Sequence, residues 1–117
     1  MNFHLPNQSN KWAWIAGLLE GEGCFSLHQR KERRNTKSCA IHCEMTDEDV
    51  IRKLHLLSGV GTVNFRPSRK NRKPTWIWSV QKKVDILEIL LGIAPFMGQR
   101  RLEKISELME HIENAGY

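Results

Sequence analysis

The stretch AWIAGLLEGEGCF, residues 13–25, begins as an apolar helix and ends in a dense run of acids and glycines. Small and apolar residues predict a helix over 11–21, which Gly21 and Gly23 terminate. The C-terminal end of a helix carries partial negative charge, so an exposed carboxylate there costs roughly 0.3–1 kcal/mol. Because Glu20 and Glu22 both stand at this end, some further interaction must compensate them.

Small residues recur along this helix at intervals of four. Ala13, Gly17 and Gly21 form one stripe, and Ala16 and Glu20 flank it. A glycine in a helix costs up to about 1 kcal/mol relative to alanine, but the stripe lets another backbone approach closely. Two readings follow: the helix packs by its stripe against its own sheet, or against the same helix of a second chain.

The second reading gives the carboxylates a function. If two such helices met at a two-fold axis, Glu22 of each chain would stand near that axis. Crowded carboxylates repel unless a cation bridges them, and hard divalent cations take carboxylate oxygens. An acid–base pair of Glu20 and Glu22 within one chain is disfavoured, because residues two apart on a helix do not share a face.

After this stretch, segments in which apolar and polar residues alternate are followed in turn by segments with helical spacing of apolar residues. Alternation predicts a first β-hairpin over 24–45 and a second over 60–81, with helices over 46–58, 83–95 and 100–116. The predicted fold is a single α+β domain, residues 1–117, of order αββαββα, with a four-stranded antiparallel sheet covered on one face by helices. The apolar residues predicted to face the helices are Phe25, Leu27, Cys39, Ile41, Cys43, Met45, Val63, Phe65, Trp76, Trp78 and Val80.

The alternate positions of the same strands form a long, mostly polar face. It comprises Ser26, His28, Arg30, Ser38, His42, Glu44, Thr62, Asn64, Arg66, Thr75, Ile77, Ser79 and Gln81. Two-stranded ribbons fit the major groove of B-DNA, where polar side chains can contact base edges. The simpler alternative is a sheet face that is polar only because it is exposed to solvent.

Charge favours the DNA interpretation. The chain has 18 Lys and Arg against 13 Asp and Glu, a formal net charge of +5. The excess gathers in two runs, RKERRNTK (30–37) and RPSRKNRK (66–73), at corresponding places in the two hairpins. Such paired runs are typical of a surface that binds phosphates. The cations predicted to do so are Arg30, Arg33, Arg34, Lys37, Arg66, Arg69 and Lys70.

The three cysteines and the N-terminus indicate an intracellular protein that is not secreted. Cys24, Cys39 and Cys43 are odd in number, and no secretory signal or membrane-spanning apolar run is present in the sequence. A zinc site at Cys39, His42 and Cys43 is disfavoured because the segment alternates like a strand and no second ligand pair follows. Buried thiols are the simpler interpretation.

The segment IAGLLEGEG, residues 15–23, resembles the nine-residue motif of the LAGLIDADG homing endonucleases. Ala16, Gly17, Leu18 and Gly23 match it, and Glu20 and Glu22 replace aspartates. A single copy of the motif implies a homodimer that places two sheets on a long, nearly palindromic duplex DNA site. The resemblance further implies double-strand cleavage with short 3′ overhangs, Mg²⁺ as cofactor and no small-molecule cofactor. A mobile element of a phage, bacterium or organelle would be its typical source.

The resemblance also assigns site residues. Glu22 corresponds to the essential metal-binding acid, with the Gly21 carbonyl as a further ligand. Asp47 corresponds to a position that organises water or metal, although an acid in the first turn of a helix is favoured anyway. The family's basic residue falls on Arg100 or Arg101, less well on Lys104, where arginine replaces the commoner lysine. The dimer interface is expected at Ala13, Ala16, Gly17, Glu20 and Gly21. The alternative function is a non-cleaving DNA- or RNA-binding module of the same fold, such as a transcription regulator or an intron maturase.

Overall fold

The order of helices and hairpins expected from the sequence is present in the computed structural model, which describes residues 8–29 and 37–114. Its elements are α1 (Gln8–Glu22), β1 (Gly23–Gln29), β2 (Lys37–Met45), α2 (Glu48–Ser58), β3 (Thr62–Arg66), β4 (Thr75–Val80), α3 (Lys83–Ile93), the 3₁₀ helix η1 (Ala94–Phe96) and α4 (Gln99–Asn114). The predicted α+β class and αββαββα order are confirmed, with α3 and α4 as a closing helical pair.

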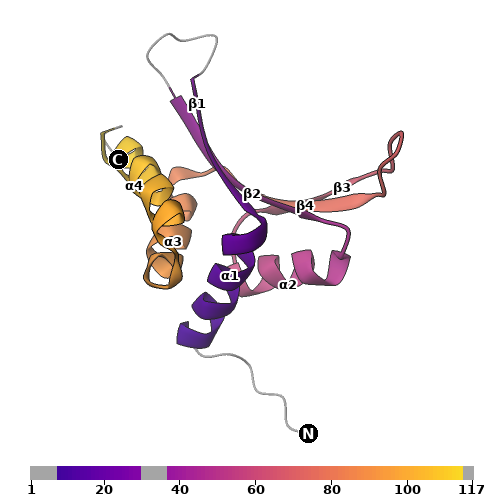
Figure 1. The fold of residues 1–117 in the computed structure, drawn as a ribbon, viewed down its shortest axis with the longest axis horizontal. Coiled ribbons are helices and arrows are strands. Elements are labelled where there is room, and N and C mark those ends of the chain that lie inside the picture. Colours follow the sequence, from indigo (N-terminus) through magenta and orange to yellow (C-terminus); the bar gives the residue numbers. More distant parts are fainter. Residues whose placement is uncertain (1–7, 30–36, 115–117) are drawn as a thin grey trace, which may run out of the picture.

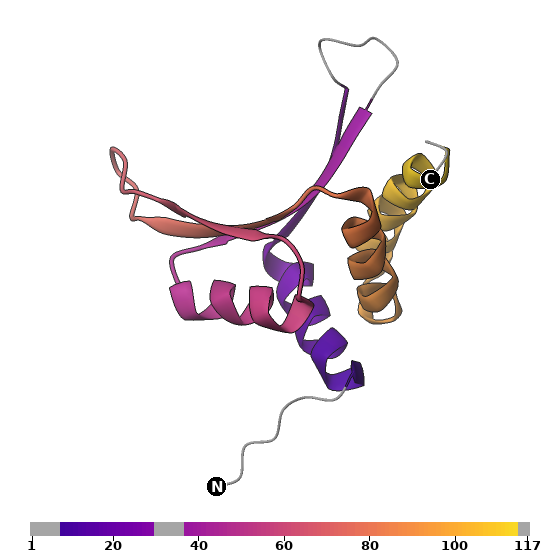
Figure 2. The ribbon, with the colours of Figure 1, turned by 180° about the vertical axis from the view of Figure 1, so that it is seen from behind.

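The four strands form one antiparallel sheet of order β1-β2-β4-β3, so the two hairpins join through β2 and β4. In this register His42 lies opposite Ser79, and Trp78 lies opposite Cys43. The helices lie on one side of the sheet, and the hairpins diverge above them (Figures 1 and 2). The other side of the sheet, between the diverging hairpins, is therefore left open.

The core lies between the sheet and the helices. Ile15 and Leu19 of α1, Ile41 of β2 and Trp78 of β4 are fully buried, and the inward-facing residues of α2, α3 and α4 complete the cluster. Cys39 and Cys43 are also buried, as expected of core thiols. Within the described residues, no helix has the length and apolar character needed to cross a membrane.

One predicted core position, Phe65, differs from expectation. Phe65 faces the helix side and packs on Trp76 with ring centroids 5.1 Å apart, yet it is 56% exposed. The tip of the β3–β4 hairpin extends past the end of α2 (Figure 1), so the helix covers only part of the hairpin's inward face. Leu102 of α4 is a further apolar side chain at the surface, 37% exposed.

The turn into β3 depends on Gly61. Its φ is +88°, and a Cβ there would lie 2.7 Å from the Ser79 carbonyl oxygen and 2.8 Å from Trp78 Nε1. That indole nitrogen donates a hydrogen bond to the Val60 carbonyl at 3.0 Å. A side chain at residue 61 would therefore disturb both the backbone and the buried tryptophan.

We expect Gly61→Ala to lower the free energy of unfolding by about 3 kcal/mol, combining left-handed strain with a steric clash. Gly59→Ala is the matched control, because Gly59 also has a positive φ of 71° but its Cβ would meet nothing within 4 Å. The control should lose only about 1–2 kcal/mol, the left-handed strain alone. Urea denaturation measures both values, and equal losses would show that the Trp78 contact is unimportant.

Candidate nucleic-acid interface and metal site

The open face of the sheet carries the polar residues predicted for it. Cross-strand register places Ser26 opposite Ala40, Glu44 opposite Ile77, and Arg66 opposite Thr75, all on the side away from the helices. His28 and Lys37 occupy β1 and β2 by their backbone, whereas Arg30, Arg33 and Arg34 lie outside the described residues. Gln81 is exposed just past the end of β4.

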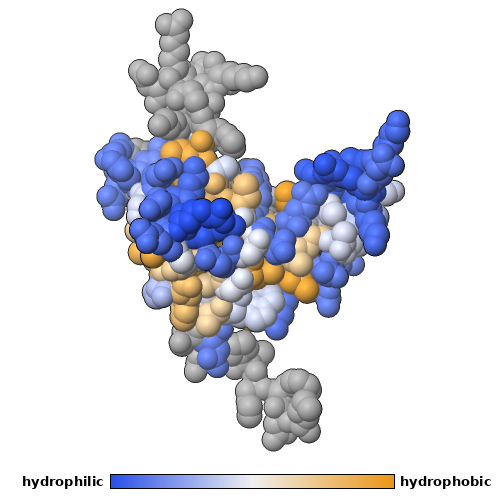
Figure 3. Space-filling view, viewed as in Figure 1, coloured by the Kyte–Doolittle hydropathy of each residue, from blue (hydrophilic) through white to orange (hydrophobic). Residues whose placement is uncertain are grey.

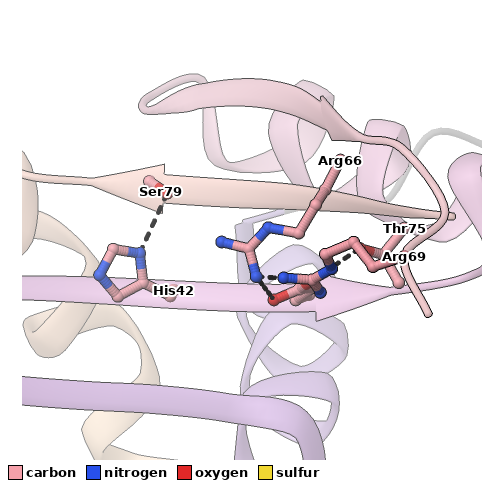
Figure 4. A network of polar contacts seen from close by, with 6 residues as sticks. His42, Arg66, Arg69, Thr75 and Ser79 are labelled. Carbon is pink, nitrogen blue, oxygen red and sulfur yellow. Dashed lines mark hydrogen bonds and ion pairs between the residues drawn. The ribbon is translucent and has the colours of Figure 1, made fainter. Parts of the chain in front are cut away.

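An acidic side chain organises the half of this face formed by β2, β3 and β4. Glu44 accepts hydrogen bonds from Arg66 Nη1 at 3.1 and 3.2 Å and from the Thr75 hydroxyl, and Arg69 Nη2 lies 3.9 Å away (Figure 4). The carboxylate is thus neutralised by two arginines, which it also orients above the sheet. The cluster offers guanidinium donors and a carboxylate acceptor to a polar ligand.

Nearer the middle of the sheet, His42 and Ser79 form a second polar pair. The ring Nδ1 of His42 lies 3.0 Å from the Ser79 hydroxyl (Figure 4). Ser26, by contrast, is only 9% exposed, and its hydroxyl donates to the Ala40 carbonyl at 3.4 Å. Ser26 therefore offers little surface, whereas His42 and Ser79 remain half-buried and reachable.

The tip of the β3–β4 hairpin is strongly basic. Arg69 and Arg72 pair across a tight turn whose Asn71 has a φ of 64°, and Lys70 and Lys73 are exposed beside them. Hydrophilic side chains cover this hairpin in the space-filling view (Figure 3). The tip carries its charge well away from the helices, as a surface for phosphates requires.

At the start of the edge strand β1, α1 runs into the sheet without a loop. Glu22 is the last residue of α1 and Gly23 the first of β1, and a Cβ on Gly23 would lie 2.7 Å from the Leu19 carbonyl oxygen. Only glycine fits this junction. The exposed Glu22 carboxylate is thereby held at the edge of the sheet, where it makes no hydrogen bond or ion pair with the described residues.

The negative charge of Glu22 affects the Cys43 thiol on β2. Burial, with a smaller contribution from the negative charge of Glu22, raises the pKa of the Cys43 thiol to about 11. Burial likewise raises the pKa of the Cys39 thiol. Both sulfurs are therefore protonated at neutral pH and are poor metal ligands.

Glu20, the other carboxylate of the motif, is satisfied within the chain. Its Oε1 accepts a hydrogen bond from the Gly98 amide at 3.2 Å, just before α4 begins. Arg101 of α4 donates to the Glu20 backbone carbonyl from Nε at 3.3 Å and Nη2 at 3.1 Å, and its Nε lies 3.9 Å from Oε2. The Arg101 guanidinium thus compensates the partial negative charge at the C-terminal end of α1. This interaction offsets the cost of placing two acidic residues at that end.

A shallow hollow lies between the start of β1 and the first turns of α4. It is lined by Gly23, Cys24, Phe25, Arg100, Arg101, Glu103, Lys104 and Glu107. The hollow adjoins Glu22 through Gly23. Arg100 is exposed, whereas the side chain of Arg101 is only 20% exposed, so the two adjacent arginines have different surroundings.

The stripe of small residues on α1 is uncovered by the rest of the described chain. Ala13, Gly17 and Gly21 are exposed, and a Cβ on either glycine would meet nothing within 4 Å. The helix does pack against its own sheet, as the first reading of the sequence has it, but through Ile15 and Leu19 and not through this stripe. Ala16 lies off this stripe in the core, at 1% exposure, and Glu20 faces α4.

The sequence profile of the LAGLIDADG endonuclease family matches residues 15–103. The chain belongs to this family. The resemblance of residues 15–23 to the LAGLIDADG motif is therefore confirmed, and the match extends over both hairpins and into α4. A comparison with curated proteins found no match to this LAGLIDADG protein.

Solved structures share the fold. The homing endonuclease I-CvuI in complex with its target has a TM-score of 0.73 and 16% identity, over 91% of this chain and 68% of that one. The group I intron-encoded homing endonuclease I-CeuI, complexed with DNA, gives 0.72 and 13% over 97% and 57%. The archaeal intron-encoded homing endonuclease I-Vdi141I, also complexed with DNA, gives 0.69 and 16% over 92% and 69%.

Asp47 stands at the N-terminus of α2 in this LAGLIDADG protein. It is the N-cap residue of the helix, but its side chain makes no capping hydrogen bond. Its carboxylate is exposed just beyond the end of β2. The negative charge of Asp47 still suits the N-terminal end of the helix dipole, but its carboxylate oxygens are not used in a cap.

The residues at the end of α1 suit a hard divalent cation. Glu22 offers carboxylate oxygens and Gly21 a carbonyl, the oxygen donors that Mg²⁺ and Ca²⁺ prefer. Among the described residues of one chain, no three His, Cys, Asp or Glu side chains gather closely enough to hold a metal ion. For such an ion, one chain would supply only part of the coordination shell, and a second chain, DNA phosphates or water would have to complete it.

Proposed function

We propose that this protein is a homing endonuclease that cleaves both strands of a long, nearly palindromic duplex DNA site, with short 3′ overhangs, as a Mg²⁺-dependent homodimer. The observation that carries the proposal is the Glu22 carboxylate, exposed and unpaired at the edge of an open polar sheet. A protein that only bound DNA would gain nothing from an uncompensated negative charge aimed at phosphates.

The open face accounts for DNA binding. Its residues lie on a curved sheet between two diverging hairpins, a form suited to the major groove (Figure 2). The His42–Ser79 pair and the Glu44 cluster would contact base edges, and Lys70 and its neighbours would contact phosphates. The structures of I-CvuI, I-CeuI and I-Vdi141I named above are DNA complexes, which supports this use of the fold.

The end of α1 accounts for cleavage. Glu22 and the Gly21 carbonyl would hold Mg²⁺, which supplies an activated water and stabilises the leaving oxygen. Asp47 would orient water near the scissile phosphate, and Arg100, in the hollow beside Gly23, would contact the phosphate charge. I-CvuI has been studied with DNA in the presence of Ca and in the presence of Mg, in the latter case with the DNA not cleaved.

A homodimer follows from the requirement for two strand breaks. One chain offers one Glu22, and the exposed Ala13–Gly17–Gly21 stripe allows a second α1 to approach closely. The two carboxylates would then lie near one axis, each serving one strand. Small residues at such an interface let the backbones come into contact.

The proposal is tested by incubating the full chain with a randomised duplex library and sequencing the broken ends. Parallel reactions contain Mg²⁺, Ca²⁺ or EDTA. We expect paired breaks, a few base pairs apart in nearly palindromic sites, with Mg²⁺ only. Site enrichment without breaks would indicate a non-cleaving binding module, and no enrichment would reject the DNA interface itself.

Phosphate contacts at the hairpin tip predict a salt effect. We expect Lys70→Gln to reduce the slope of log affinity against log salt by about one unit, because each neutralised phosphate contributes about 0.9. Arg52→Gln on α2 is the control: it removes one cation from the covered side of the sheet, and its slope should match wild type. Fluorescence anisotropy in EDTA measures both slopes, and an unchanged value for Lys70→Gln would place this residue off the DNA.

A further inference from the structure

We propose that Glu20, Gly98 and Arg101 form a latch that positions the metal-binding end of α1, and that Arg101 is a positioning residue and not a phosphate contact. This inference rests on the proposed function for its effect on cleavage. Its structural part does not, because the latch consists of contacts within one chain.

The latch is reciprocal. The Glu20 carboxylate accepts a hydrogen bond from the Gly98 amide (3.2 Å). The Gly98 carbonyl accepts one from the Leu102 amide (3.0 Å), so Gly98 is the N-cap residue of α4. In the other direction Arg101 donates two hydrogen bonds to the Glu20 carbonyl at the end of α1. Each helix thus satisfies terminal backbone groups of the other, with charges that suit both helix ends.

Arg101 also reaches the strand that follows α1. Its guanidinium carbon lies 5.4 Å from the centre of the Phe25 ring, and Phe25 is 5% exposed in the core at the start of β1. Glu22 lies between Glu20 and Phe25, so Arg101 holds the chain on both sides of the metal-binding residue. A residue held on both sides keeps its carboxylate in a fixed place before metal arrives.

The latch distinguishes the two adjacent arginines. The donors of Arg101 already serve Glu20, and its side chain is 20% exposed. Arg100 makes no ion pair with the described residues and is exposed in the same hollow. Arg100 is therefore the phosphate contact, and Arg101 acts through Glu20 on Glu22.

Four variants test the latch. Arg101→Gln removes the forked donor, and Arg101→Lys keeps the charge but loses the fork. Gly98→Ala changes no charge, but its Cβ would lie 2.8 Å from Glu20 Oε1 and displace the carboxylate. Arg52→Gln is the control, because it removes an exposed arginine–glutamate pair on α2 (2.8 Å) that is remote from the site.

Two measurements are made on each full-length variant. The first is amide hydrogen exchange at residues 20–23 without metal or DNA. The second is the Mg²⁺ concentration that gives half-maximal cleavage, together with DNA affinity in EDTA. We expect all three latch variants to exchange faster at residues 20–23 and to need about tenfold more Mg²⁺. Their DNA affinity and its salt slope should equal those of wild type and Arg52→Gln.

Other outcomes overturn the inference. Unchanged exchange in Arg101→Gln and Gly98→Ala would show that the latch does not hold α1. Near-normal cleavage by Arg101→Lys, with weaker DNA binding by Arg101→Gln, would make Arg101 a phosphate contact. If the wild type cleaves nothing under any metal, the proposed function fails, while the exchange measurement still decides whether the latch exists.

Discussion

Glu22→Gln abolishes DNA cleavage and leaves DNA binding intact, if the carboxylate at the end of α1 holds the metal. The substitution keeps size and hydrogen-bonding capacity but removes the negative charge. Metal stabilisation of the leaving oxygen is worth several kcal/mol, and each 1.36 kcal/mol corresponds to about a tenfold change in rate. We therefore expect the cleavage rate to fall by more than about a thousandfold.

Glu20→Gln is the matched comparison for this variant, because it makes the same chemical change two residues earlier. Glu20 lies in the latch with Gly98 and Arg101, and a glutamine oxygen can still accept from the Gly98 amide. The Glu20→Gln variant should therefore cleave DNA, with an increased Mg²⁺ requirement, whereas Glu22→Gln should not. Single-turnover cleavage over a Mg²⁺ titration separates the two. Equal rates for Glu22→Gln and wild type would remove Glu22 from the metal site.

A further consequence concerns the protein without metal. Removing the charge of Glu22 takes away one of the causes that raise the pKa of the Cys43 thiol, so that pKa should fall. Burial, the larger cause, remains, so the thiol stays protonated at neutral pH. A lower pKa of Cys43 in Glu22→Gln than in wild type, measured by thiol titration, would check that the Glu22 carboxylate lies where the structure places it.

The sequence predicted the sheet well because its signal is local. Alternation with period two placed Ile41 and Trp78 inward and His42 and Glu44 outward, and the register confirms this. Alternation assigns a face, however, and not the element that covers it. Phe65 was therefore placed on the correct side, but it is largely exposed because its hairpin extends beyond α2.

The site was less predictable, because its contacts join distant segments. Glu20 and Arg101 are 81 residues apart, and no spacing or composition relates them. Successive residues on a helix point about 100° apart, so the choice between Arg100 and Arg101 depended on how α4 packs against α1. The motif singled out Glu22 as the expected metal ligand, and the structure shows that it precedes a junction that only Gly23 can occupy.

Gly17→Leu prevents dimerisation without unfolding the chain. Gly17 is exposed at the middle of the α1 stripe, and a Cβ there would meet nothing within 4 Å among the described residues. Leucine is also a better helix former by up to about 1 kcal/mol, so the monomer should not be destabilised. Between two closely packed α1 helices, however, two leucines would force the backbones apart. At a central interface position this costs about 3 kcal/mol or more, about a hundredfold in the dimer dissociation constant.

Sedimentation velocity over a range of concentrations measures this effect, and Ser106→Leu is the control. Ser106 is an exposed residue of α4, so the control adds similar bulk to a helix surface away from the stripe. We expect wild type and Ser106→Leu to sediment as dimers and Gly17→Leu as a folded monomer with normal circular dichroism. Because one monomer carries one Glu22, this variant should also lose paired breaks in DNA. A Gly17→Leu protein that remains dimeric would place the interface elsewhere, and would leave the two carboxylates without a common axis.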